Sequence, residues 1–313
     1  MPRTPARLLS VACAATLLAA CSGGATSPST TTSPSTTTSP STAPTTAALS
    51  DQQIVERAVA AVTTPAATTP ATTATPGGAA SSATRPTFSA DSGVRLLARS
   101  TPLGGYPASW LAVTQPQEGV PALVVVTQPA ASAAAKATRL VPLLDGAQVR
   151  AFPSLSSGTA FSAPAGLAIT PEALVTAYAK SLVHPSPSPL PKTVAADPFA
   201  AQVRAAETQL ADGVKGAGSA TSTQRILPGT TTVTQADGGA LVLATLERTT
   251  TITVTEGAEV ATPAAFQAAK GPKTLKHKGT WVTQEALAFE VPKGAGQAHL
   301  VGADERTVSA SGS

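Results

Sequence analysis

The sequence predicts an α+β protein in which two successive helix-plus-antiparallel-sheet units follow a disordered spacer. Apolar residues recur at helical spacing in residues 50–62, 170–182 and 197–214. Groups of short apolar or alternating segments follow the first and the last of these, which is typical of antiparallel strands. Residues 22–48 are almost entirely Ser, Thr, Pro, Gly and Ala, so they contain too little apolar surface to fold.

The first twenty residues have the features of a bacterial lipoprotein signal peptide. Arg3 and Arg7 give a positive start, residues 8–18 form a short apolar run, and Leu18-Ala19-Ala20-Cys21 fits the lipobox pattern. A membrane span would need ~20 apolar residues. We expect cleavage before Cys21, lipid including palmitate on that cysteine, and a chain held at the extracellular face of the cell membrane. The alternative is an ordinary secretory signal with the cysteine there by chance.

The other cysteine, Cys13, lies within the segment that cleavage would remove, so we expect no disulfide in the mature chain. The predicted organisation is a signal peptide at 1–20, a disordered spacer at 21–48, a first α+β unit at 49–168 with a disordered insertion at 63–87, and a second α+β unit at 169–308.

The first unit is predicted to begin with a helix. Ser50 has the position of an N-cap and Gln53 that of its capping-box partner. The apolar face of this helix is expected to contain Ile54, Val55, Ala58, Val59 and Val62. Predicted strands follow at 94–98, 109–113, 122–127 and 139–144, the last interrupted by Pro142.

The second unit is predicted to begin with two helices. Thr170-Pro171 and Asp197-Pro198 each combine an N-cap residue with proline at the first helical position. The second helix is expected to bury Phe199, Val203, Ala206, Leu210 and Val214. Predicted strands at 230–235 and 241–255 flank the turn signal Asp237-Gly238-Gly239. Further strands are predicted at 275–291 and 298–301, and residues 309–312 are predicted to be a tail.

Several segments resemble actinobacterial lipoproteins that carry a C-terminal domain of unknown function. They are the lipobox, the Ser/Thr/Pro spacer, LVPLLDG at 140–146, ADPF at 196–199, LERTTT at 246–251 and FEVPKG at 289–294. The resemblance implies no particular activity. The helix-plus-sheet pattern looks like two cone-shaped units of the nuclear-transport-factor-2-like kind, in which a curved sheet wraps a helix and often leaves a pocket. This is an analogy at the level of the fold.

The composition and the missing motifs exclude several classes of function. Charged residues are 12% and aromatic residues 3% of the chain, which is too few for a nucleic-acid-binding surface. The sequence contains no Gly-x-Ser-x-Gly, no P-loop and no dinucleotide fingerprint. His184, His277 and His299 lack metal-ligand spacing. We therefore expect no metal, no cofactor and no nucleic-acid partner.

Two groups of charged residues remain as sites. Lys270, Lys273, Lys276 and Lys278 form a basic cluster that either contacts anionic headgroups or wall polymers, or is a solvated turn that blocks edge pairing. Glu247 or Glu290 would become a general base if it pointed into a cone, and would otherwise be a solvent-facing charge.

We prefer a non-catalytic binding or scaffolding module on a lipid anchor, with an envelope protein or a wall polymer as partner. The alternative is a small-molecule-binding or enzymatic cone-fold domain that uses a buried carboxylate, and its pocket would contain Glu247, Glu290, Asp197 or Tyr178. A substrate-binding lipoprotein of a transporter ranks last, because the predicted strands are consecutive and lack helical crossovers.

Overall fold

Two antiparallel sheets organise the described part of the chain, which confirms the α+β class and the antiparallel pairing. The computed structural model describes residues 49–63, 93–100, 105–115, 120–157 and 161–313. The predicted signal peptide, Cys21, the spacer and nearly all of the predicted insertion lie outside these residues.

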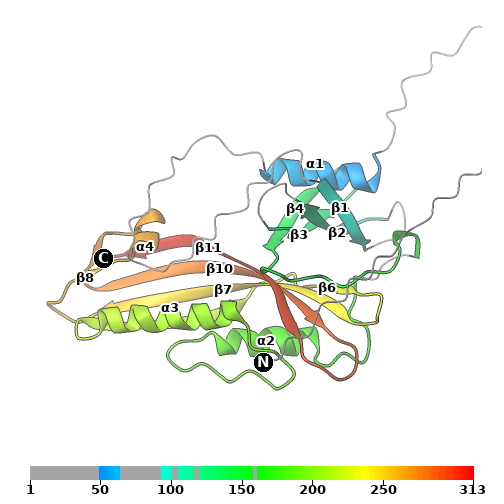
Figure 1. The fold of residues 1–313 in the computed structure, drawn as a ribbon. Coiled ribbons are helices and arrows are strands. Elements are labelled where there is room, and N and C mark those ends of the chain that lie inside the picture. The colour runs from blue at the N-terminus through cyan, green and yellow to red at the C-terminus, as the bar shows by residue number, and fades with distance from the viewer. Residues whose placement is uncertain (1–48, 64–92, 101–104, 116–119, 158–160) are drawn as a thin grey trace, which may run out of the picture. The chain divides into compact units, whose positions relative to one another are not determined.

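The strands of the first sheet pair antiparallel in chain order (Figure 1). They are β1 (Gly93–Arg99), β2 (Ala108–Gln115), β3 (Ala122–Gln128) and β4 (Lys136–Pro142). The first three match the predicted strands. The fourth begins earlier than predicted and ends at Pro142, after which Leu143 forms a bridge to Gly302 of the second sheet.

Helix α1 (Asp51–Thr63) packs on one face of the first sheet. Its start contains the predicted capping box: the N–H of Ser50 donates to Gln53 Oε1 at 3.0 Å, and the N–H of Gln53 donates to Ser50 Oγ at 3.3 Å. The two bonds satisfy donors that the first helical turn leaves free. The interface with the sheet is a buried apolar cluster that includes Val55, Ala58, Val59, Trp110, Ala112 and Val124.

The second sheet has longer strands in the order β11, β10, β7, β5, with β6 also paired to β7. These strands are β5 (Gly218–Ile226), β6 (Thr231–Thr234), β7 (Ala240–Val254), β10 (Lys278–Val291) and β11 (His299–Gly312). The predicted turn joins β6 to β7, where Gly238 has a φ of 81° and Asp237 Oδ1 accepts the N–H of Gly239. A positive φ is the conformation that glycine adopts without steric cost.

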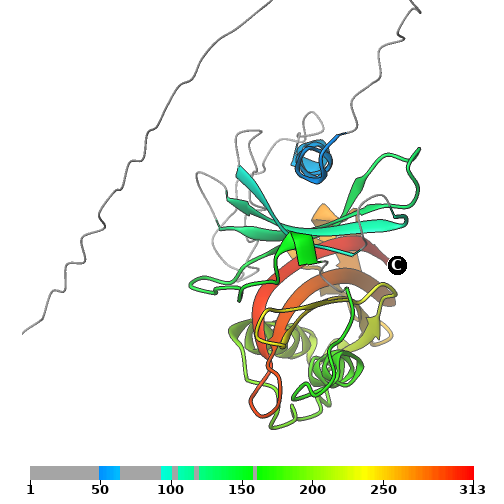
Figure 2. The ribbon, with the colours of Figure 1, turned by 90° about the vertical axis from the view of Figure 1, so that its right-hand side faces the viewer.

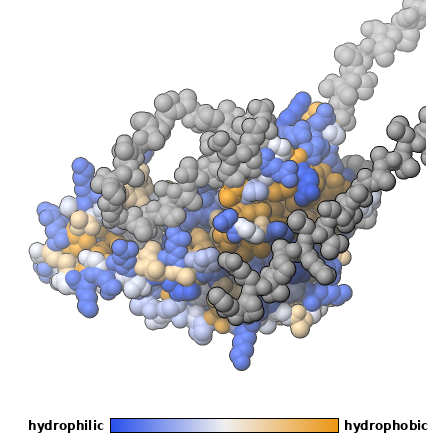
Figure 3. Space-filling view, in the orientation of Figure 1, coloured by the Kyte–Doolittle hydropathy of each residue, from blue (hydrophilic) through white to orange (hydrophobic). Residues whose placement is uncertain are grey.

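Helices α2 (Pro171–Ser181) and α3 (Pro198–Val214) pack on one face of the second sheet. Both begin as predicted, because Thr170 and Asp197 accept the N–H groups of Ala173 and Ala200. The ring of Tyr178 meets that of Phe289 edge to face, with centroids 4.9 Å apart. In Figure 3, hydrophobic residues gather over the strands below α1, whereas hydrophilic residues predominate along the lower edge near α3.

The other faces of the two sheets share a core. This core includes Leu111, Leu123 and Val125 from the first sheet and Leu241, Leu243 and Val301 from the second. The layers in residues 49–313 are therefore α1, the first sheet, the second sheet, and α2 with α3 (Figure 2). Figure 2 also shows β10 and β11 bending around the side on which the two helices lie.

A short 3-10 helix, η1 (Leu155–Ser157), lies between β4 and α2, and three further short elements lie between β7 and β10 in the sequence. They are β8 (Val260–Ala261), α4 (Ala264–Ala268) and β9 (Thr274–Leu275), with β8 and β9 paired antiparallel. A separate apolar cluster around Phe266, Ile252 and Leu275 holds them against the ends of the long strands. No helix among the described residues is long and apolar enough to cross a membrane.

Two sequence predictions are wrong, and one strand was missed. Residues 309–312 are the end of β11 and not a tail, because β10 offers them a full ladder of backbone partners. Strand β5 was not predicted. Ala206 is exposed, and the buried side chain beside it in α3 is that of Glu207. A carboxylate is acceptable there only because charged and polar partners meet it.

Candidate functional site

A groove of about 530 Å³ opens where the first sheet meets the second. Strands β2, β3 and β4 form one wall, and β7, β10, β11 and the β5–β6 loop form the other. Its lining is rich in hydroxyl groups, from Ser109, Thr127, Thr138, Thr230, Thr231 and Thr245. Phe161 and a few aliphatic side chains add apolar surface. A concave site with several hydrogen-bonding groups on a partly apolar wall is the usual form of a ligand site.

Arg139 lies in this groove and reaches from β4 to the second sheet. Its guanidinium donates to the carbonyl oxygens of Leu243 at 3.0 Å and Gly229 at 2.9 Å. It also donates to the hydroxyls of Thr245 at 3.2 Å and Thr231 at 3.5 Å. All four acceptors are neutral. Burial lowers the pKa of Arg139 below its ordinary value, although an arginine remains charged at neutral pH.

Three other arginines differ from Arg139, because each of them pairs with at least one carboxylate. Arg99 pairs with Asp51 at 2.8 Å and Arg225 pairs with Glu247 at 2.6 Å. Arg150 contacts both Asp237 and Glu290. The positive charge of Arg139 is thus partly desolvated. None of the hydrogen-bond acceptors that the described residues supply to it is a carboxylate.

Arg306 adds a second positive charge to the groove. It lies on β11, is exposed, and donates to Gln284 Oε1 on the neighbouring strand at 2.7 Å. None of the described residues that line the groove is Asp or Glu. The groove therefore combines two guanidinium groups with hydroxyls that donate or accept hydrogen bonds.

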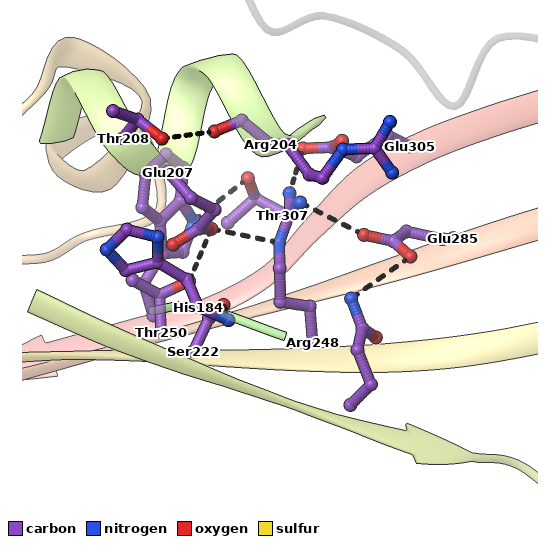
Figure 4. A network of polar contacts seen from close by, with 12 residues as sticks. His184, Arg204, Glu207, Thr208, Ser222, Arg248, Thr250, Glu285, Glu305 and Thr307 are labelled. Carbon is purple, nitrogen blue, oxygen red and sulfur yellow. Dashed lines mark hydrogen bonds and ion pairs between the residues drawn. The ribbon is translucent and has the colours of Figure 1, made fainter. Parts of the chain in front are cut away.

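A second polar cluster is buried between α3 and the second sheet (Figure 4). Arg248 forms ion pairs with Glu207 at 3.3 Å, Glu285 at 3.1 Å and Glu305 at 2.8 Å. The side chains of Arg248, Glu207 and Glu285 are 7%, 6% and 0% exposed, and that of Glu305 is 38% exposed. Three carboxyl groups thus surround one guanidinium.

Neighbouring polar side chains complete this cluster. Thr250 donates to Glu207 Oε1 at 3.0 Å, and Gln224 Nε2 donates to Glu285 Oε2 at 3.4 Å. Burial raises the pKa of Glu285 to about 7, although the charge of Arg248 opposes the rise. Burial alone would lower the pKa of Arg248, but the carboxylates raise it above its ordinary value. The cluster lines neither the inter-sheet groove nor the groove beside α2 that is bordered by Thr170 and Lys180, so we interpret it as structural.

The carboxylates singled out in the sequence lie in three different places. Glu247 forms a cross-strand pair with Arg225. Glu290 accepts hydrogen bonds from Gln235 Nε2 at 2.7 Å and from the N–H of Arg150 at 2.6 Å. The hydroxyl of Tyr178 donates to Asp197 at 3.0 Å, and burial raises the pKa of Tyr178. None of Glu247, Glu290, Asp197 and Tyr178 lines the inter-sheet groove or the second groove, which is about 540 Å³ and lies beside α2.

The predicted lysine cluster is spread along the segment from α4 to the start of β10. Lys270, Lys273, Lys276 and Lys278 are all exposed. Lys276 lies 3.5 Å from Glu259, so one charge of the cluster is partly neutralised. Among the described residues, no group of three His, Cys, Asp or Glu side chains is placed to hold a metal ion.

Comparison of the chain with protein-family models, with curated proteins and with solved structures found no match.

Proposed function

We propose that this chain is a lipid-anchored envelope protein whose folded part is a non-catalytic binding module, with the inter-sheet groove as its binding site. The observation that carries the proposal is the hydroxyl-rich lining of that groove, contributed by both sheets. Hydrogen-bonding groups that rigid strands hold in place suit the recognition of a polar ligand.

The residues that line the groove also support binding over catalysis. Its described hydroxyls are not accompanied by a histidine, a carboxylate or a lysine that could serve as a general base. A wall polymer or an envelope protein is the partner that fits the proposed location. The lysine cluster is a further proposed contact with anionic headgroups or wall polymers.

A cone-fold domain that uses a buried carboxylate is the second candidate. We infer a cone-like arrangement for the second unit from the bend of β10 and β11 around α2 and α3. Its buried carboxylate would be Glu247, Glu290 or Asp197, and because none of them lines either groove, this candidate ranks second. We also propose that the chain is a member of the actinobacterial lipoprotein family described above.

We expect that Cys21→Ser releases the protein from the membrane fraction. The variant lacks the thiol that takes the lipid, and each buried CH₂ of an acyl chain contributes about 0.8 kcal/mol to membrane association. The measurement is the share of protein in the membrane pellet after cell fractionation, with the unchanged chain as control. A variant that still sediments with membranes would show that the anchor is not the lipid on Cys21.

We expect that Thr230→Trp abolishes binding to the insoluble wall fraction of the producing cells. Thr230 is exposed in the β5–β6 loop, so an indole there would fill the groove without disturbing a sheet. Thr223→Trp is the matched control, because Thr223 is also exposed but does not line the groove. Co-sedimentation of the detergent-purified full chain measures the bound fraction. Equal binding by the two variants would exclude the groove as the site.

A further inference from the structure

We propose that the inter-sheet groove binds the anionic group of a hydroxyl-rich ligand, a sugar or polyol that carries a phosphate or a carboxylate, through Arg139 and Arg306. This inference rests on the proposed function, because it takes the groove as the binding site. It adds the charge and the chemical class of the ligand.

The first argument is the imbalance of charge in the groove. Two guanidinium groups line it, and no Asp or Glu does so among the described residues. Arg139 is partly desolvated, and its hydrogen-bond acceptors among the described residues are all neutral. Moving a cation out of water without a counter-charge is unfavourable. A bound anion would supply the missing negative charge.

The second argument is the geometry of Arg139. A guanidinium has five N–H donors in a fixed plane. The described hydrogen bonds use Nε once, Nη1 twice and Nη2 once, so one N–H of Nη2 has no acceptor among them. The Nη2 bond to Gly229 lies at the exposed end of the side chain. The described residues therefore hold the charge in place and leave one N–H of Nη2 available at the end where a ligand would enter.

The third argument concerns the rest of the ligand. Thr138 and Thr231 already donate to the carbonyl oxygens of Val125 and Gly229, so their hydroxyls can only accept from a ligand. The other hydroxyls of the lining can donate or accept, and so can pair with the hydroxyls of a sugar or polyol as well as with the oxygens of an anion. Gln284 adds an amide that already orients Arg306. The ring of Phe161 offers an apolar surface for the C–H face of a sugar ring. A simple inorganic anion would leave most of these groups unused.

A purely structural role for Arg139 makes a different prediction. As a clamp between the sheets, it would stabilise the fold but give no saturable binding of anions. Arg306 separates the two explanations, because it is exposed and its one described hydrogen bond joins two neighbouring strands that a full ladder already holds.

The test uses the detergent-purified full chain and titration calorimetry at low ionic strength, with four probes. Glycerol 3-phosphate, glucuronate and inorganic phosphate are the anionic probes, and glucose is the neutral one. We expect saturable binding of the first two, weaker binding of inorganic phosphate and the weakest binding of glucose. The ratio between glycerol 3-phosphate and glucuronate distinguishes a phosphate from a carboxylate ligand.

Three variants accompany the titrations. Arg306→Gln is expected to lower the affinity for both organic anions by roughly tenfold, and Arg139→Met is expected to lower it by roughly a hundredfold. Each substitution removes a charge-assisted hydrogen bond to the ligand. Arg95→Gln removes the same charge from an exposed site on β1 outside the groove and should change nothing. Since Arg139→Met also breaks contacts between the sheets, its circular dichroism spectrum is compared with that of the unchanged chain, and Arg306→Gln decides the result if it unfolds.

Two outcomes would overturn the inference while leaving the proposed function intact. One is that glucose binds as tightly as the anions. The other is that the Arg306→Gln and Arg95→Gln variants bind the organic anions with equal affinity. If no probe binds and Thr230→Trp leaves binding to the wall fraction unchanged, the proposed function fails together with the inference.

Discussion

Replacing Arg248 with methionine is expected to lower the free energy of unfolding by about 3–5 kcal/mol at about pH 8. The guanidinium lies between Glu207, Glu285 and Glu305, and the first two of these carboxyl groups are almost completely buried. Without it, the side chains remain in a poorly solvated site and repel one another. Removing one partner of a buried ion pair destabilises the fold far more than the intact pair stabilises it, because the other charge is left buried without a counter-charge.

Urea denaturation followed by circular dichroism measures this loss. Arg225→Met is the matched control, because Arg225 pairs with Glu247 in a similar way but its side chain is 67% exposed. Exposed pairs contribute about 0–1 kcal/mol, so the control should change little. If Arg248→Met costs no more than Arg225→Met, the cluster does not have the energetic role that its burial indicates.

Replacing Glu285 with glutamine is expected to stabilise the protein above pH 7 and to have little effect near pH 5. The pKa of Glu285 is about 7 in the folded protein and about 4.5 when the chain is unfolded. Because the folded pKa is raised, the stabilising contribution is complete below about pH 4.5 and is lost as the pH rises through about 7. Glutamine resembles the protonated acid, so it keeps this contribution at high pH.

The size of the effect follows from the same shift. A pKa difference of this size corresponds to on the order of 3 kcal/mol between the two ends of the pH range. The measurement is the difference in unfolding free energy between the variant and the unchanged chain at about pH 5 and about pH 8.5. Glu247→Gln, a change in a partly exposed pair, is the control. A difference that is the same at both pH values would contradict the raised pKa.

Local sequence signals predicted the starts of helices well. The capping box at Ser50 and Gln53 and the Thr170-Pro171 and Asp197-Pro198 pairs all function as expected, since each depends on residues within one turn. Within the strand predicted at 241–255, Thr residues alternate with Ile252 and Val254, which is typical of a half-buried strand, and both aliphatic side chains are buried.

Features that depend on distant partners were not predictable in this way. Strand β5 has only one buried apolar side chain, Ala220, along most of its length, and its structure comes from pairing with β7. The burial of Glu207 requires Arg248, and the role of Arg139 requires Leu243 on β7 and Gly229 in the β5–β6 loop. No periodic pattern records these contacts. A charged residue at the start of an apolar run, as Arg139 is before Leu140 and Val141, was the only local signal.

The core between the sheets also has a consequence for how the protein unfolds. One face of the first sheet carries Leu111 and Leu123, and it packs against the face of the second sheet that carries Leu241 and Leu243. Each of these faces shields the other from water. Opening one sheet would expose the apolar side of its neighbour, so partial unfolding is costly and amide protons in both sheets should exchange through the same global event. Among the described residues, the cluster that α1 shares with the first sheet is separate from this core and has fewer buried side chains. Detaching α1 would expose that cluster alone, so its amide protons should lose protection first.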